Sequence, residues 1–498
     1  MNHELASDLT PEELVSVRDG HLYNDDLAPV RSDQRRWGTR DIAYLWVGMS
    51  VCIPTYMLAS GLISSGMNWW QAILTVTLGN LIVLIPMILN GHAGTKYGIT
   101  FPVFARAAFG VRGTHVASVL RALVACGWFG IQTWIGGFAI YKLALLQWPS
   151  LADTAVIGPP FSSPHIEVNI AQFICFLIFW AVNVGIFWRG MESIRVVENL
   201  GAPLLIGLGL ALLIWAYIKA DGFGPMLSQP SQFETAGDFW RVFFPGLTAM
   251  VGFWATLSLN IPDFTREAKS QKDQVLGQFL GLNTTMPLYA FIGVAVTSAT
   301  LVIFGETIWD PVELLSRFDR IGLMIISMFA LTLATLTTNL AANVVAPSTA
   351  FTNFFPRHIS MRMGGVLTGL VGIVIMPWKL VADPSGYIFT WLIGYSALLG
   401  PIGGILVCDY FLIRKTKMDL AGLYREQGPY TYTHGFNLKA MAALALAIAP
   451  NVPGFLTQIK LVQAGPFWSG LYHYAWFIGF ILAFVIYAAL MRTKESTP

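Results

Sequence analysis

The stretch "GWFGIQTW" combines an aromatic ring and an amide at the spacing of one helical turn. Trp128 and Gln132 are four residues apart, so a helix through this apolar region places both side chains on one face. An indole can stack on a flat ring, and a glutamine beside it can hydrogen-bond the edge of that ring. The alternative is that Trp128 packs between helices while Gln132 bonds to a neighbouring backbone. A second indole, Trp254, follows Gly252 in a later apolar stretch, where it either faces a cavity or packs between helices.

The segment "TLATLTTNLAANVVAP", residues 332–347, holds four threonines and two asparagines among apolar residues. A hydroxyl or amide without a partner in hydrocarbon costs about 1–3 kcal/mol, so these groups must be bound to something. Small polar residues often hold membrane helices together, and that role suffices for any single threonine. Two asparagines and a Thr-Thr pair together favour a ligand-binding role. One helix face carries Thr332, Thr335, Asn339 and Asn343.

Several kinds of reactive site are missing. No aspartate or glutamate falls in the middle of an assigned apolar span, whereas proton-driven carriers commonly place a carboxylate there. All eight histidines lie in tails, loops or helix ends, and the four cysteines lie in apolar stretches as buried thiols. We therefore expect no enzyme activity and no cofactor, because neither a nucleophile nor a metal constellation is present. The net charge of +2 gives no reason to expect a nucleic-acid partner.

Apolar residues dominate the chain that must position these groups. Of 498 residues, 55% are hydrophobic and only 12% are charged, about half the charged share of a soluble domain. Apolar runs of about 20 residues recur along the length, as in membrane-spanning helices. We expect an all-α polytopic membrane protein with twelve transmembrane helices and no soluble catalytic domain. The expected spans are 41–62, 69–89, 115–144, 168–188, 200–219, 239–262, 279–304, 321–345, 362–378, 386–412, 438–455 and 467–491.

Two of the expected spans contain helix breakers. Pro54 lies in the middle of the first span, and the sixth span has Gly252 before Trp254 and then Pro262. Interrupted helices near the midplane of a membrane expose backbone groups that bind ions or polar solutes in transporters. Because the two interrupted spans lie five apart, they suit equivalent positions in a five-plus-five repeat.

Lysine and arginine give the expected orientation. They concentrate in alternate connecting segments such as 31–40, 266–269 and 414–415, which the positive-inside rule assigns to the cytoplasm. Both termini are then cytoplasmic. Arg121 lies toward the inner end of its span, and its side chain is expected to snorkel or to pair near the inner surface. Asp263 and Arg266 are expected to form a gate or a surface ion pair.

Seven segments carry a resemblance to a known family. They are "NGHAGTKYGITFPV", "GWFGIQTW", "MESI", "WATLSLNIPDFTR", "QKDQVLGQF", "TTNLAANVVAP" and "CDYFLIRK". The chain resembles the nucleobase–cation symporter family one, the hydantoin, allantoin, uracil and cytosine permeases, and within it the bacterial allantoin permease branch. The resemblance implies the leucine-transporter fold, with two inverted five-helix repeats plus two extra C-terminal helices, and transport by alternating access. The divisions are a polar, solvated N-terminal tail 1–40, repeats 41–220 and 239–412, a cytoplasmic loop 413–437, two helices within 438–491, and a C-terminal tail 492–498.

The resemblance also implies roles for single residues. Trp128 and Trp254 would sandwich a planar heterocycle, while Gln132 and Asn343 would hydrogen-bond its amide edge. Sodium would be bound by carbonyls of the first span and by a carbonyl and two hydroxyls of the eighth. The residues at these sodium positions are Gly48, Val51, Ala334, Thr337 and Thr338. Thr332, Thr335 and Asn339 then keep a helix-packing role.

The sequence departs from the family pattern at two positions of the expected pocket. Cys52 stands where relatives place an amide side chain, and a thiol is a weak hydrogen-bonding group. Phe253 stands where a relative can have glycine, which narrows or reshapes the pocket. Both departures leave open which ring system is bound.

We expect a cation-coupled secondary transporter that imports allantoin or a related ureide or hydantoin. A uracil or other nucleobase permease, coupled to protons, is the alternative. Sodium is the expected coupling ion because paired hydroxyls are present and a midplane carboxylate is absent. The expected location is the cell's inner (plasma) membrane, and the expected partners are the substrate, the cation and the lipid bilayer, with no obligate protein partner. A channel, a membrane-embedded enzyme and a sensor are the rival classes.

Overall fold

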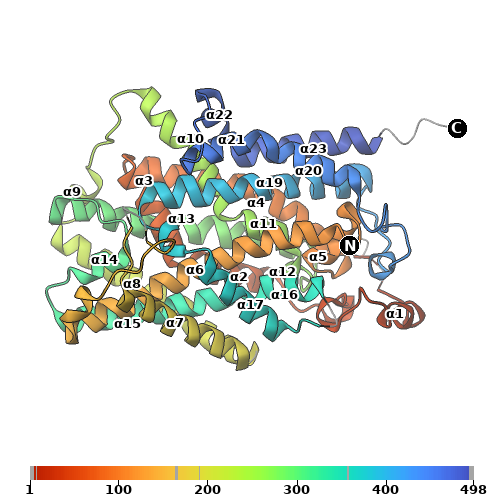
Figure 1. Cartoon of the computed structure of the whole chain (residues 1–498), viewed down its shortest axis with the longest axis horizontal. Coiled ribbons are helices and arrows are strands. Elements are labelled where there is room, and N and C mark those ends of the chain that lie inside the picture. Colours follow the sequence, from red (N-terminus) through yellow and green to blue (C-terminus); the bar gives the residue numbers. More distant parts are fainter. Residues whose placement is uncertain (1–4, 7, 163–165, 190, 356–357, 493–498) are drawn as a thin grey trace.

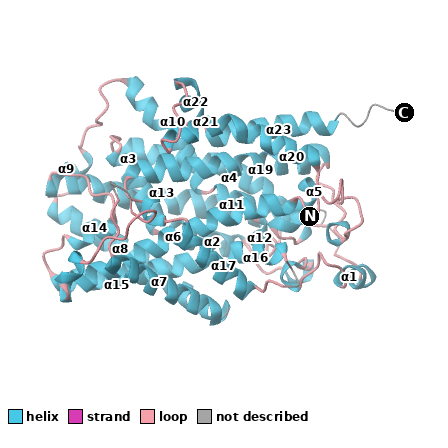
Figure 2. Cartoon of the chain, in the orientation of Figure 1, coloured by secondary structure: helices cyan, strands magenta, loops and turns pink. Residues whose placement is uncertain are grey.

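The computed structural model describes residues 5–6, 8–162, 166–189, 191–355 and 358–492. The expected C-terminal tail, apart from Arg492, lies outside this part of the chain. Helices joined by loops make up the described residues (Figure 2). Helix α1 (Pro11–Arg18) and the C-terminal end of α23 (Ala475–Arg492) lie at one end of the long axis of the molecule, whereas α9 (Phe223–Leu227) and α14 (Pro311–Ser316) lie at the opposite end (Figure 1). An all-α architecture is therefore confirmed.

Nine of the twelve expected spans coincide with helices long and apolar enough to cross a membrane, counting one bent pair, within the described residues. The eight unbent spans are α4 (Trp69–Tyr97), α6 (Thr114–Gln147), α7 (Ile170–Arg189), α13 (Gln271–Phe304), Ile321–Phe354, Gly386–Ile413, Leu438–Gln458 and α23 (Ala475–Arg492). The bent pair is α2 (Thr39–Ser50) with α3 (Ile53–Ser64). The other three expected spans coincide with α8 (Met191–Lys219), α10 (Ala236–Phe253) with α11 (Ala255–Asn260), and α17 (Met361–Val374).

The first span is broken where Pro54 predicts it. Helix α2 ends at Ser50, α3 begins at Ile53, and the two axes differ by 58°. Proline has no N–H and fits the first turn of a helix, so Pro54 starts α3 and cannot continue α2. The break redirects backbone donors: the N–H of Cys52 donates to the carbonyl of Ser50, and that of Thr55 to the carbonyl of Cys52. Consequently Gly48 and Val51 lose the donors that an unbroken helix would give their carbonyls.

The sixth span is also broken, as expected. Trp254 is the joint between α10 and α11, with φ −97° and ψ 4°. A second interruption follows at Pro262, which begins the short helix α12 (Pro262–Thr265). Together these breaks place the indole of Trp254 at a bend in the middle of the span.

The eighth span differs from the expectation of a single helix over 321–345. Helix α15 (Ile321–Asn343) ends at Asn343, and α16 (Val345–Phe354) resumes at once and extends to Phe354. Pro347 does not stop the chain, because it lies in the first turn of α16, where a proline costs little. Asn343 therefore sits at a joint within the span.

Close packing holds α2 against α13. A Cβ added at Gly281 would lie 2.6 Å from the Cβ of Trp46, so only glycine permits this approach. Helix α15 packs against α6 and α8, and α2 also contacts α15. The broken first span is thus held between α13 on one side and the threonine-rich α15 on another.

The N-terminal tail is docked, contrary to the expectation of a solvated segment. Val17 and Leu27 are buried, and the hydroxyl of Tyr424 donates to the carbonyl of Leu27. Trp37 exchanges backbone hydrogen bonds with the segment after α12, donating to Glu267 and accepting from Lys269. The apolar residues within this polar tail explain the difference, because burying them stabilises the docked tail enough to offset the entropy lost when the chain is ordered.

Candidate substrate and cation site

A cavity of about 40 Å³ lies where the breaks of the first and sixth spans meet α6 and α15. The structure brings together all six residues expected to contact substrate, and Thr338 lies beside them. The cavity is lined by Met49, Cys52, Pro54, Trp128, Gln132, Phe253, Trp254, Thr256, Leu257, Thr338, Ala342 and Asn343. Sequence reasoning missed Met49, Thr256, Leu257 and Ala342, which carry no chemical signal and are placed only by the fold.

Trp128 and Trp254 approach the cavity from different helices. The ring of Phe253 contacts both, with centroid distances of 5.3 Å to Trp128 and 4.9 Å to Trp254 and both pairs edge-to-face. The indole nitrogen of Trp254 donates to Oδ1 of Asn80 at 3.1 Å, which fixes this ring against α4. Phe253 is thus the ring that any flat ligand between the two indoles must displace or pack against.

Gln132 and Asn343 supply amide groups to the cavity. Both side chains are buried, and Oε1 of Gln132 has no hydrogen-bond donor within the described residues. The Nδ2 group of Asn343 donates to Oδ1 of Asn339 at 3.1 Å, so its own oxygen is the atom left to face a ligand. Two amide oxygens in a cavity walled by aromatic rings suit a planar molecule that carries N–H groups.

Asn339 anchors Asn343 through a buried network. Its Nδ2 group contacts Oγ1 of Thr133 on α6 and Oδ1 of Asn183 on α7, each at 3.1 Å. These bonds support the helix-packing role expected for Asn339. The partners Thr133 and Asn183 were missed, although an asparagine in the middle of the apolar span 168–188 was a usable signal.

Cys52 is already engaged by a neighbour. Its sulfur lies 3.2 Å from Oγ1 of Thr55, one turn further along α3. The thiol is buried beside Pro54 and lines the cavity. A ligand would therefore compete with Thr55 for a group that already binds weakly.

Of the five residues expected to hold sodium, Gly48 lies on α2 and Val51 directly follows that helix. Ala334, Thr337 and Thr338 lie on α15, which contacts α2. The hydroxyls of Thr337 and Thr338 both donate to the carbonyl of Ala334, at 2.7 and 3.2 Å. This geometry leaves the lone pairs of both hydroxyl oxygens available to a cation. Gly48 and Val51 are the residues whose carbonyls are released by the break. Of these five residues, Thr338 lines the cavity.

Arg121 forms a buried pair, which is the alternative to snorkelling. It is buried rather than snorkelling, and its Nη2 group donates to Oδ1 of Asn260 at 2.8 Å. The amide of Asn260 in turn donates to Asp263, whose other oxygen accepts from the N–H of Phe101 at 2.7 Å. The surface pair of Asp263 with Arg266 is wrong within the described residues, because Asp263 turns inward to cap the start of α5 (Phe101–Phe109).

A second cavity, of about 280 Å³, lies one turn further along the same helices. It is lined by Met57 of α3 and Ile135 of α6, which follow Pro54 and Gln132 of the first cavity by three residues each. Asp310, between α13 and α14, closes its far side, and burial raises the pKa of this carboxyl to about 6.

Comparison with known proteins identifies the family. Residues 29–479 match the family model described as "Permease for cytosine/purines, uracil, thiamine, allantoin". The chain belongs to this family. It is 47% identical to the purine-uracil permease of Arabidopsis thaliana over 95% of the chain and 78% of that protein. It is 38% identical to the allantoin permease of Bacillus subtilis over 95% of this chain and 93% of that protein.

Solved structures agree with this assignment. The inward-facing conformation of Mhp1 matches with a TM-score of 0.77 and 27% identity, covering 95% of this chain and 94% of that one. A second structure of Mhp1, described as a nucleobase-cation-symport-1 family transporter, is in a closed conformation with bromovinylhydantoin bound. It matches with a TM-score of 0.75 and 27% identity, covering 95% of this chain and 96% of that one. The expected leucine-transporter-like fold and the family are thereby confirmed, and the chain is a membrane transporter rather than an enzyme.

Proposed function

We propose that this family member is a cation-coupled symporter that imports allantoin or a related ureide or hydantoin. The observation that carries the proposal is the pair of amide oxygens, on Gln132 and Asn343, exposed to one cavity whose walls include Trp128 and Trp254. Ureides and hydantoins are flat or nearly flat, and their N–H groups match these acceptors. Aromatic walls add stacking on the faces of the ring.

The small size of the cavity suits alternating access. A volume of about 40 Å³ accommodates roughly three waters by the usual requirement of 10–15 Å³ each. A heterocycle therefore enters only if Phe253 or the halves of the broken spans shift. Breaks at Ser50–Ile53 and at Trp254 give the chain the joints that such a shift requires.

A uracil or other nucleobase is the second candidate substrate, favoured by the 47% identity to the plant purine-uracil permease. Uptake of labelled allantoin and of labelled uracil should be measured in cells expressing the chain, with unlabelled allantoin, hydantoin, uracil and cytosine as competitors. We expect allantoin and hydantoin to compete for both labels. Uracil uptake that allantoin leaves unchanged would replace the first substrate by the second, and no uptake of either label would refute both.

We infer sodium as the coupling ion from the oxygen groups on α2 and α15. Replacing Thr338 by Ala removes one cation ligand, so sodium should no longer stimulate uptake. Thr332→Ala is the matched control, because Thr332 lies on the same helix and its hydroxyl donates to the carbonyl of Met328. Uptake in a sodium gradient and in a proton gradient should be compared for both variants. Equal stimulation in Thr338→Ala and in the parent would contradict the assignment.

The indole of Trp128 is proposed to stack on the substrate ring. Trp128→Ala should weaken substrate binding by about 5- to 150-fold, which corresponds to roughly 1–3 kcal/mol of stacking. Trp240→Ala, at an exposed position of α10, is the control for loss of an indole elsewhere. Equilibrium binding of labelled substrate to purified protein measures both. Unchanged affinity in Trp128→Ala would leave this indole a packing role only.

We propose that the chain lies in the plasma membrane with both termini in the cytoplasm. The placement of α1 and of the C-terminal end of α23 at the same end of the molecule supports a common side for the two termini (Figure 1). Lysines and arginines of the segments 31–40 and 414–415 belong to that same side by the positive-inside rule. Fusing a fluorescent protein that folds only in the cytoplasm to each terminus in turn tests this orientation, and a dark fusion at either end would contradict it.

A further inference from the structure

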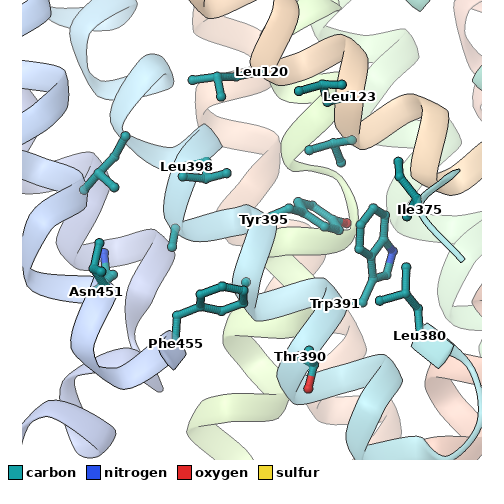
Figure 3. A pocket seen from close by; sticks show the side chains of 15 residues that line it. Leu120, Leu123, Ile375, Leu380, Thr390, Trp391, Tyr395, Leu398, Asn451 and Phe455 are labelled. Carbon is teal, nitrogen blue, oxygen red and sulfur yellow. The ribbon is translucent and has the colours of Figure 1, made fainter. Parts of the chain in front are cut away.

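A third cavity, of about 350 Å³, shares no lining residue with the proposed substrate cavity. Figure 3 shows the side chains that line it. Helices α6, α19 (Ile393–Val407) and α21 (Val452–Gln458) form its main walls. Its volume falls within the range of small-molecule sites. Representative lining residues are Leu120, Leu123, Tyr395, Leu398, Val452 and Phe455.

Two prolines lie at a helix joint beside this cavity. The eleventh span, which begins as α20 (Leu438–Ile448), is interrupted by Pro450 and Pro453 before α21 continues it. Asn451 holds the joint in place by donating to the carbonyl of Ala475. The cavity lies between this joint and Gly394 and Ala397 of α19, whose small side chains leave it unfilled.

Carbon atoms line this cavity. The hydroxyl of Tyr395 is directed toward Trp391, and the indole nitrogen of Trp391 lies on the side of Leu380 and Ile375 (Figure 3). The hydroxyl of Thr390 accepts from Gln458 at 3.4 Å. A heterocycle rich in N–H groups finds few partners on such walls, whereas a hydrocarbon loses nothing by entering them.

The mouth of the cavity faces the lipid. Leu123 and Val452, which line it, are 41% and 42% exposed on spans that cross the membrane. The solvent of that surface is the acyl region of the bilayer. We propose that the cavity between α6, α19 and α21 binds one hydrocarbon chain of a membrane phospholipid.

This lipid site shares a wall with the substrate cavity. Trp391 and Tyr395 contact each other with ring centroids 4.9 Å apart. On their other side they contact Trp128, at 5.8 and 6.3 Å. Both residues belong to the span that begins with the π-helical segment Gly386–Leu392, a geometry frequent at functional sites. A chain in the cavity thus supports the aromatic residues that hold the indole of Trp128 in position.

Photolabelling tests the site. The full chain is reconstituted in phosphatidylethanolamine and phosphatidylglycerol vesicles that contain a phospholipid with a diazirine at the end of one acyl chain. After illumination, labelled peptides are mapped by mass spectrometry. We expect label on residues 120–124 and 452–455 in excess of that on the lipid-facing side of α20. Label spread evenly over α20 and the cavity walls would overturn the proposal.

Substitutions locate the label in the cavity. Leu398→Trp fills the interior and Leu123→Trp fills the mouth, so both should abolish labelling of residues 452–455. Leu446→Trp is the matched control, since Leu446 is exposed on α20 and does not line the cavity, and it should keep the label. Leu123→Trp lies at the surface and answers the question even where Leu398→Trp fails to fold. Persistent labelling in Leu123→Trp, or labelling by a diazirine fatty acid but not by the phospholipid, would overturn the proposal.

Discussion

Two networks of buried amide side chains in this transporter have the same hydrogen-bonding chemistry but end on different groups. On α13, Gln271, Gln274 and Gln278 form a ladder, with Nε2 of Gln274 donating to Oε1 of Gln271 at 3.1 Å and Nε2 of Gln278 to Oε1 of Gln274 at 2.5 Å. On α15, Asn339 joins α6 and α7, and its oxygen accepts from Asn343. The glutamine ladder ends on the backbone of α4, whereas the asparagine network ends in the cavity that we propose to bind substrate.

The difference lies in what the last amide contacts. The side chain of Gln271 donates to the carbonyl of His92 at 2.9 Å. The neighbouring residue Gly91 leaves room for Gln274, because a Cβ added at Gly91 would lie only 2.8 Å from Oε1 of Gln274. The ladder therefore fastens α13 to α4. Asn343 instead lines the cavity with its oxygen left for a ligand. Polar groups in a membrane span are thus structural or functional according to where their chain of bonds stops.

Asn339→Leu should give the largest effect, because it removes the centre of the asparagine network. Three side-chain hydrogen bonds are lost, which at about 0.6 kcal/mol each lowers the free energy of unfolding by about 2 kcal/mol. Asn343 loses the partner that orients it, so substrate affinity should fall by about tenfold as well. Thermal unfolding and equilibrium binding measure the two losses. A stable variant with full affinity would show that the network does not support the cavity.

The sequence predicts the breaks of this fold better than its contacts. Pro54, and Gly252 with Pro262, interrupt their spans as local chemistry requires, because a missing N–H acts on its own helix. Helical periodicity likewise places Trp128 and Gln132 on one face, and both line the cavity. A periodic pattern does not say which neighbouring helix a face meets. The pattern therefore predicts neither the partners of Asn339 nor the docking of the N-terminal tail. Both are seen only in the three-dimensional structure.

Arg121 illustrates the limit of reasoning from a single helix. Its distance along α6 suggested an inner-surface position, where a long side chain reaches water. The structure buries it and gives it Asn260, a residue 139 positions away in sequence. The pairing depends on a neighbour that the sequence around Arg121 does not contain.

Asn343→Ala should separate affinity from stability. The variant deletes the end of the asparagine network and leaves the bonds of Asn339 to Thr133 and Asn183 in place. Substrate affinity should fall by about tenfold, because one hydrogen bond to the ligand is lost and that bond contributes about 1.4 kcal/mol to binding. The free energy of unfolding should change by less than about 0.6 kcal/mol. An equal loss of stability in Asn343→Ala and Asn339→Leu would remove the distinction between the end of the network and its centre.

Gln274→Leu is the converse and gives the smallest change at the cavity. Leucine has a similar size but leaves Gln271 and Gln278 without their shared partner, so the free energy of unfolding should fall by roughly 1 kcal/mol. Substrate affinity should stay at the parent value, because no member of the ladder lines the cavity. Thermal unfolding in the absence and presence of saturating substrate compares the two properties in one experiment, since the ligand-induced shift depends on affinity. A lost shift in Gln274→Leu would mean that the position of α13 against α4 also controls substrate binding, and the glutamine ladder would then be functional in the same sense as the asparagine network.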